Sequence, residues 1–99
     1  MAKTFAGFDW DDGNWPKCGK HGVSLAEIEI VLSGQAAILP DLAHSQEETR
    51  FLAIGRTSEG RHVFVCFTLR ERQGDHYVRP ISARYMRQKE GNSYEEENS

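Results

Sequence analysis

Apolar residues recur at helical spacing in one segment of the chain. Four of them fall on a single helix face: Leu25, Ile28, Val31 and Leu32. Ser24 precedes this run, and Glu27 follows three residues after Ser24. This spacing is the pattern of a capping box. We therefore predict an amphipathic helix over Ser24–Ser33 that ends at Gly34.

A shorter helix is predicted before this one. Asn14 is a residue type that caps helices, and Pro16 suits the first helical turn. Gly19 and Gly22 then interrupt the helix. Still earlier, the alternation of Phe8-Asp9-Trp10 predicts a short first strand.

Beyond the second helix the chain alternates between apolar and polar positions, which is typical of strands. We predict four strands, over residues 36–39, 49–56, 61–70 and 77–83. Residues 57–60 and 73–75 have the composition of turns. Pro80 cannot donate to a ladder, so the last strand should be an edge strand or carry a bulge there. Residues 86–97 are predicted to form a C-terminal helix that Gly91 weakens.

These elements predict an α+β fold in which a short first strand and two N-terminal helices pack on an antiparallel β-meander, followed by the C-terminal helix. The 99 residues suit one domain over residues 1–99, with about residues 92–99 frayed. No apolar run approaches the roughly 18 residues of a membrane span, and the first residues resemble no secretory signal. We expect a cytoplasmic protein without a disulfide, in which Cys66 is an inert core thiol.

Charge is distributed unevenly along the chain. Residues 1–48 carry a net charge of −5, residues 49–90 carry +5, and residues 91–99 carry −3, although the total is only −3. All eight arginines lie in the middle block: Arg50, Arg56, Arg61, Arg70, Arg72, Arg79, Arg84 and Arg87. Because the arginine fork matches phosphate geometry, this block favours phosphate binding over generic solubility.

Several short motifs occur in order over about residues 8–96. They are Trp10-Asp11, Lys20-His21-Gly22-Val23-Ser24, Asp41-x-x-His44-Ser45, Glu48-x-Arg50, Ile54-Gly55-Arg56 and Ile81-Ser82-Ala83-Arg84. Together they resemble the BrnT family, the toxin half of type II toxin–antitoxin pairs, whose fold is distantly similar to that of RelE-type ribonucleases. The resemblance implies a ribonuclease that cuts RNA and arrests growth. It also implies a cognate antitoxin, a BrnA-like ribbon-helix-helix protein. The toxin would contact operator DNA only through this antitoxin.

Cleavage of RNA without a metal ion uses the 2′-hydroxyl as the nucleophile. It needs a base, an acid, and cations for the charge that gathers on the phosphorane oxygens. The candidate catalytic residues are His21, His44, Glu48, Arg79 and Arg84. The candidate substrate-binding residues are Lys20, Arg50 and Arg70. Histidine is the residue type that ionises near neutral pH, which suits proton transfer.

Each candidate also has a structural interpretation. A single arginine is often only a surface ion pair. His21 is equally suited to capping the first helix, and His44 to bonding its own loop backbone. Alternation along the last predicted strand places Arg79 and Arg84 on opposite faces, with Arg79 half covered and Arg84 just past the strand end.

Neither a metal nor another cofactor is expected. Cys18-x-x-His21 has the spacing of metal ligands, but no second pair completes a site. Trp10 is expected in the core, and Trp15 is expected to be more exposed. The alternative function is a non-catalytic module that docks an antitoxin or DNA-binding partner and tunes operon repression. The acidic total charge and the lack of a certain acid–base pair favour that alternative, whereas the concentrated arginines favour the enzyme.

Overall fold

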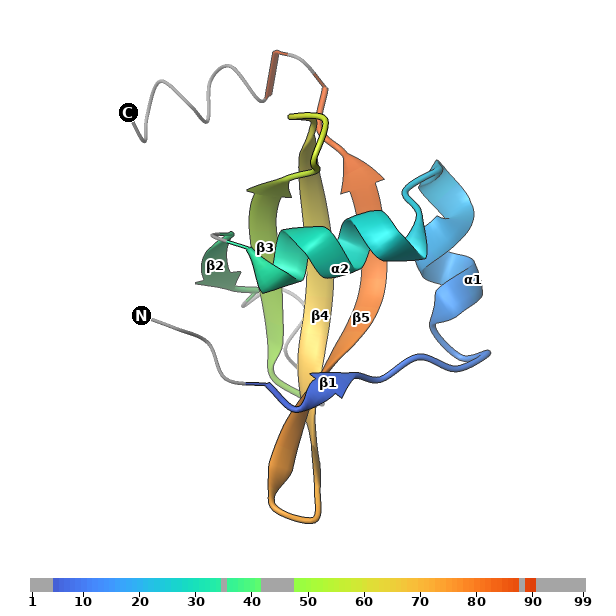
Figure 1. Ribbon diagram of the computed structural model, residues 1–99, viewed down its shortest axis with the longest axis vertical. Coiled ribbons are helices and arrows are strands. Elements are labelled where there is room, and N and C mark those ends of the chain that lie inside the picture. Colours follow the sequence, from blue (N-terminus) through green and yellow to red (C-terminus); the bar gives the residue numbers. More distant parts are fainter. Residues whose placement is uncertain (1–4, 35, 42–47, 88, 91–99) are drawn as a thin grey trace.

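The computed structural model describes residues 5–34, 36–41, 48–87 and 89–90. In chain order its elements are β1 (Gly7–Phe8), α1 (Trp15–Cys18), the 3₁₀ turn η1 (Gly19–His21), α2 (Leu25–Ser33), β2 (Ala37–Pro40), β3 (Arg50–Arg56), β4 (His62–Arg72) and β5 (Asp75–Tyr85). In this part of the chain the strands form one sheet in the order β1-β5-β4-β3-β2 (Figure 1). The α+β class is confirmed. The sheet is mixed rather than purely antiparallel, because β1 pairs parallel to β5.

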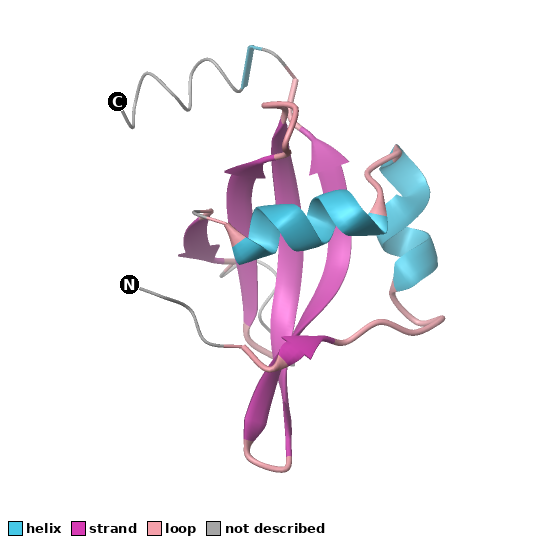
Figure 2. Cartoon of the chain, in the orientation of Figure 1, coloured by secondary structure: helices cyan, strands magenta, loops and turns pink. Residues whose placement is uncertain are grey.

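Helix α2 covers one face of the sheet, where it contacts β3 and β4 (Figure 2). Its capping box is confirmed, since the Ser24 hydroxyl accepts from the Glu27 amide and the Glu27 carboxylate accepts from the Ser24 amide. Val31 of α2 comes so close to β3 that a Cβ on Gly55 would lie 3.0 Å from it. The helix therefore packs tightly where it crosses the strand. No described helix is long and apolar enough to cross a membrane.

The first helix is only one turn long and continues into η1, beside β5. Asn14 stands at the N-cap position, but its side chain does not cap the helix, so that detail of the prediction is wrong. Instead, its side-chain oxygen accepts from the Asp11 amide at 2.9 Å. Its side-chain nitrogen donates to the carbonyl oxygens of Asp9 at 2.9 Å and Pro80 at 2.8 Å. The buried Asn14 thus ties the loop before α1 to β5.

The hairpin of β4 and β5 is longer than the sequence predicted. The two strands pair out to Arg72 and Asp75, and β5 continues to Tyr85. Arg84 therefore lies within β5 rather than past its end, which corrects the expectation. The predicted C-terminal helix is not seen: among the described residues of the 86–97 segment, Met86 and Arg87 are not helical, and only Lys89 and Glu90 are. Residues 88 and 91–97 of that prediction lie outside the described residues.

A register shift interrupts the pairing of β4 with β5. Cys66 pairs with Ser82, whereas the next residue, Phe67, pairs with Pro80. Ile81 is left without a partner and forms a bulge. Because proline cannot donate to the ladder, a bulge at this position follows from its chemistry. Of the two predicted alternatives, an edge strand or a bulge at Pro80, the structure has the bulge, with the neighbouring Ile81 as its unpaired residue, and β5 lies between β1 and β4.

Alternation along β4 divides the sheet into two faces. Val63, Val65 and Phe67 are buried in the core with α2, so the residues between them point to the opposite side. We call that opposite side the arginine face. By register it carries Arg50, Leu52, Ile54 and Arg56 of β3, His62, Phe64, Cys66, Thr68 and Arg70 of β4, and Tyr77, Arg79, Ser82 and Arg84 of β5.

The bulge also changes which arginines share a face. Arg79 pairs with Thr68 and Arg84 pairs with Phe64, and both partners lie on the arginine face. The expectation that Arg79 and Arg84 point to opposite faces is therefore wrong. The extra residue, Ile81, shifts the alternation by one position between them.

Replacement of Asn14 tests its role as a tie between the loop and β5. Asn14→Ala removes three hydrogen bonds and leaves buried backbone groups unsatisfied, so it should lower the free energy of unfolding by about 2–4 kcal/mol. Asp12→Asn, at an exposed neighbouring position, should change it by less than about 0.5 kcal/mol. Chemical denaturation of both variants measures the difference, and equal stabilities would contradict the assignment.

Candidate functional site

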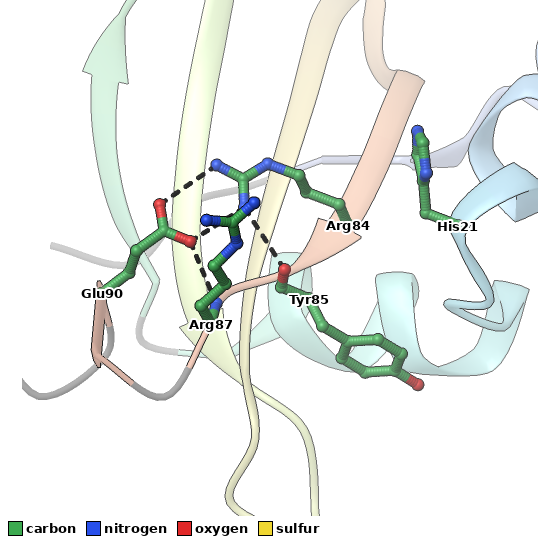
Figure 3. Close-up of a pocket in the computed structure, with 5 residues that line it drawn as sticks. All are labelled: His21, Arg84, Tyr85, Arg87 and Glu90. Carbon is green, nitrogen blue, oxygen red and sulfur yellow. Dashed lines mark hydrogen bonds and ion pairs between the residues drawn. The ribbon is translucent and has the colours of Figure 1, made fainter.

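A pocket of about 570 Å³ lies at the end of β5 and is lined by His21, Arg84, Tyr85, Arg87 and Glu90 (Figure 3). His21 comes from η1, which ends at Gly22 with a φ of 89°. A glycine adopts this left-handed conformation readily, and it leaves His21 exposed at the end of the turn. Two sequence-predicted catalytic residues, His21 and Arg84, are thus brought to the same pocket.

The guanidinium of Arg84 is held on three sides. It lies 4.5 Å from the centroid of the Phe64 ring, on the arginine face. Its two terminal nitrogens donate to the two carboxylate oxygens of Glu90 at 3.1 and 3.3 Å, and one of them also donates to the Tyr85 carbonyl at 3.3 Å. The side chain of Arg84 is nevertheless 46% exposed, so it is reachable from solvent.

Glu90 is the acidic member of the pocket. Its hydrogen bonds from the Arg84 side chain and from the Arg87 amide lower its pKa to about 2. The Arg87 amide donates to it at 3.0 Å (Figure 3). Glu90 is therefore ionised at neutral pH, and its charge is directed at the guanidinium of Arg84.

Tyr85 fixes the end of β5 against the start of α2. Its hydroxyl donates to Glu27 at 2.7 Å, and the Arg61 guanidinium lies 3.5 Å from the centroid of its ring. The hydrogen bond to Glu27 raises the pKa of Tyr85. The Ser24 amide, followed by the Tyr85 hydroxyl, lowers the pKa of Glu27. Sequence reasoning found the capping box but missed this contact, because no local pattern links residues so far apart in the chain.

The other predicted arginines lie further along the arginine face. Arg50 and Arg79 flank Thr68 in one row across β3, β4 and β5, and Arg70 is two residues further along β4. From Phe64, the partner of Arg84, the strand rises about 13 Å to Thr68 and about 20 Å to Arg70. The predicted site residues are thus divided between the pocket and this second group of arginines.

Two arginines of the second group, Arg70 and Arg79, pair with carboxylates. Arg70 donates to Glu48 at 2.5 Å, so this predicted base lies beside Arg70 rather than in the pocket. Arg79 donates to both carboxylate oxygens of Asp11 at 3.0 Å, and lies 3.4 Å from the buried carboxylate of Asp9. The hydrogen bond with Asp11 raises the pKa of Arg79, and the same bond lowers the pKa of Asp11.

The remaining candidates are dispersed. Lys20 is exposed on η1, whereas His44 lies outside the described residues. Trp10 packs against the core, as predicted, and Trp15 is 37% exposed with its ring edge-on to Trp10. Cys66 is only partly buried on the arginine face, which corrects its expected place in the core. Burial still raises the pKa of its thiol, so the thiolate is disfavoured.

Among the residues that the structure describes, no group of three or more histidine, cysteine, aspartate or glutamate side chains is arranged to hold a metal ion. The Cys18-x-x-His21 pair does not form part of one, because Cys18 is fully buried while His21 is exposed. Burial raises the pKa of the Cys18 thiol to about 11, so the thiol is protonated at neutral pH. Cys18 belongs to the hydrophobic core.

These features define a small α+β protein with an arginine-lined pocket at one end of its sheet. The family model of the ribonuclease toxin BrnT, of type II toxin–antitoxin systems, matches residues 10–90. The chain belongs to this family and is a ribonuclease toxin of a type II toxin–antitoxin system, for which an antitoxin is the partner. No curated protein matches the sequence. The matched range includes the five residues that line the pocket.

The pairing of Arg79 generates a prediction about stability. Arg79→Ala leaves Asp11 without the arginine that bonds to both its oxygens and removes one of two arginine partners of the buried Asp9, so it should lower the melting temperature. Arg72→Ala removes another partner of Asp9, but that arginine is 61% exposed and its loss should matter less.

The pH dependence checks the cause. The folded protein lowers the pKa of Asp11, so the stabilisation is present above the ordinary carboxyl pKa and is lost as the pH falls below about 4. The difference in melting temperature between the parent and Arg79→Ala should therefore shrink in acid. A difference that stays constant down to about pH 3 would show that Arg79 acts through packing instead.

Proposed function

We propose that this ribonuclease toxin cleaves RNA internally without a metal ion, with the scissile phosphate in the pocket at the end of β5. One observation carries the proposal: the pocket brings together His21 and Arg84, which come from opposite ends of the chain. Membership of a ribonuclease toxin family supports it. The presence of Arg87 in the same pocket supports it further, because a second guanidinium strengthens the attraction for phosphate.

In the proposed mechanism the 2′-hydroxyl of the substrate attacks the adjacent phosphate. The two terminal N–H groups of Arg84 stabilise the charge that develops on the phosphorane oxygens. His21 transfers a proton, either from the 2′-hydroxyl or to the leaving 5′-oxygen. Glu48 bonds to Arg70, about 20 Å along β4 from the row of Arg84, so it lies too far from this phosphate to transfer the second proton. His44 is left as the candidate for the second proton-transfer group.

The arginine face would carry the flanking nucleotides. Arg50 and Arg79 share one row of it and Arg70 lies two residues further from Arg84, and a basic track of this kind follows the backbone of single-stranded RNA. Lys20 is exposed and adjacent to His21 in the chain, so it would serve as a further phosphate contact beside the pocket.

A cognate antitoxin, proposed to be a BrnA-like ribbon-helix-helix protein, would silence the toxin by covering this basic surface. A partner that presents carboxylates would match its charge, and electrostatic complementarity speeds such association. Contact with operator DNA would then come only through the antitoxin. We further propose that the fold is related to that of RelE-type ribonucleases, which the helix packed on one face of an antiparallel β2–β5 sheet supports.

One observation favours the alternative of a non-catalytic docking module. Arg70, Arg79 and Arg84 each pair with a carboxylate of the chain itself, so none of the three presents an unopposed positive charge. The two functions differ in whether the purified protein cuts RNA.

The test replaces the two pocket residues. Arg84→Ala should slow cleavage about 10²–10³-fold, as removal of a donor to a developing oxyanion does. Arg84→Lys should recover part of the rate, because an ammonium cannot reproduce the fork. His21→Gln should remove one limb of the pH–rate profile.

The melting temperature separates catalysis from folding. Both side chains are exposed, so neither variant should melt far below the parent. Full cleavage by both variants would place the active site elsewhere. A parent protein that cuts no RNA would favour the docking module.

Metal independence has its own test. Cleavage by the purified protein should persist in excess chelator, since the proposed chemistry uses only side chains and the 2′-hydroxyl. The measurement is the cleavage rate before and after chelator. Loss of activity that a divalent ion restores would contradict a metal-free mechanism.

A further inference from the structure

Glu90 and Arg84 meet in the geometry with which arginine binds phosphate. Two parallel N–H···O bonds join them, one from each terminal nitrogen to each carboxylate oxygen. Carboxylates and phosphates offer the arginine fork the same edge, two oxygens on one atom. The edge of Arg84 that would hold a phosphate is thus occupied by a side chain of the protein.

We propose that the carboxylate of Glu90 is an internal stand-in for the RNA phosphate, which must displace it from Arg84 before cleavage. This inference rests on the proposed function, because it takes Arg84 as the phosphate-binding residue. The ligand class is a phosphodiester of single-stranded RNA. Glu90 then weakens RNA binding in the free toxin and acts as an autoinhibitory contact.

Position and exposure make this exchange feasible. Both groups line the pocket, and their side chains are 46% and 37% exposed, so the pair is reachable from solvent. An exposed ion pair contributes little free energy, so a polyanion with several phosphates outcompetes it. By contrast, the Asp9 carboxylate beside Arg79 is 7% exposed and belongs to the fold.

Protonation cannot release Glu90 near neutral pH. Its bonds to Arg84 and Arg87 lower its pKa to about 2, so the carboxylate competes with phosphate over the whole neutral range. Release therefore depends on the arrival of a competing anion. The inhibition should weaken RNA binding by a constant factor across neutral pH.

Glu90 also has a local role that the test must preserve. It accepts from the amide of Arg87, three residues earlier, which is the same contact that Glu27 makes with Ser24. Glutamine keeps this backbone contact, since it serves in capping boxes as glutamate does. Glu90→Gln therefore removes the negative charge while retaining the side-chain shape.

The experiment measures binding and cleavage by the full chain. Binding of a fluorescent 2′-O-methyl RNA oligonucleotide, which has no free 2′-hydroxyl to attack, reports affinity alone. Glu90→Gln should tighten it about two- to fivefold, the range that corresponds to a surface ion pair. Glu71→Gln is the matched control, because Glu71 carries the same charge but pairs with His76 on the distant hairpin. The affinity of this control variant for the oligonucleotide should equal that of the parent.

A double variant tests whether Glu90 acts through Arg84. In the Arg84→Ala background, Glu90→Gln should give no further gain, because the shared partner is absent. Melting temperatures of all variants exclude a folding effect.

The possible failures are distinguishable. If Glu90→Gln binds no better than Glu71→Gln, or cleaves more slowly than the parent at unchanged affinity, the stand-in role is overturned; the second result would make Glu90 a proton-transfer group. If Arg84→Ala itself binds and cleaves like the parent, the proposed function fails together with this inference.

Discussion

The bulged ladder between β4 and β5 is the constraint on which the placement of the arginines depends. It runs from Arg72 and Asp75 at the hairpin to Val63 and Tyr85 at the other end. The one unpaired residue of this ladder, Ile81, shifts the alternation of side chains by one position between the two halves of β5. Without it, Arg79 and Arg84 would lie on opposite faces of the sheet.

The carboxylates that match these arginines come from segments outside the ladder. Asp9 and Asp11 follow β1, Glu48 precedes β3, and Glu90 follows β5. This arrangement explains how strongly opposed charge blocks coexist in a chain with a net charge of −3. An exposed ion pair contributes little to the free energy of unfolding. The burial of a pair therefore decides whether it stabilises the fold or whether a ligand can replace its carboxylate.

The sequence predicted well those elements whose signals are local. The capping box of Ser24 and Glu27 and the apolar spacing after it specify α2, and Pro80 marks the bulge. The effect of that bulge on the faces could not be predicted, because a proline indicates that a bulge exists but not which residue is unpaired. The capping role of Asn14 failed because its side-chain oxygen accepts from the Asp11 amide instead, while its side-chain nitrogen is held by a buried carbonyl of β5.

Candidate site residues were harder to predict than the fold. His21 and Arg84 share a pocket because η1 packs beside the end of β5, a contact between distant parts of the chain. Glu48 and Arg70 also meet, but at the other end of the arginine face. Residue type alone indicated that each could act on RNA. Only the register of the sheet determines which of them can act on the same phosphate.

The geometry of the pocket rests on the first turn of α2. Two residues, Gly22 and Val23, join His21 to Ser24, the N-cap of that turn, and the buried Val23 fixes the link in the core. From the other side, Tyr85 bonds to Glu27 in the same turn and holds the strand that carries Arg84. Both proposed reactive groups are therefore positioned against one capping box. A local folding signal, strong enough to read from the sequence, sets the separation between the histidine and the arginine.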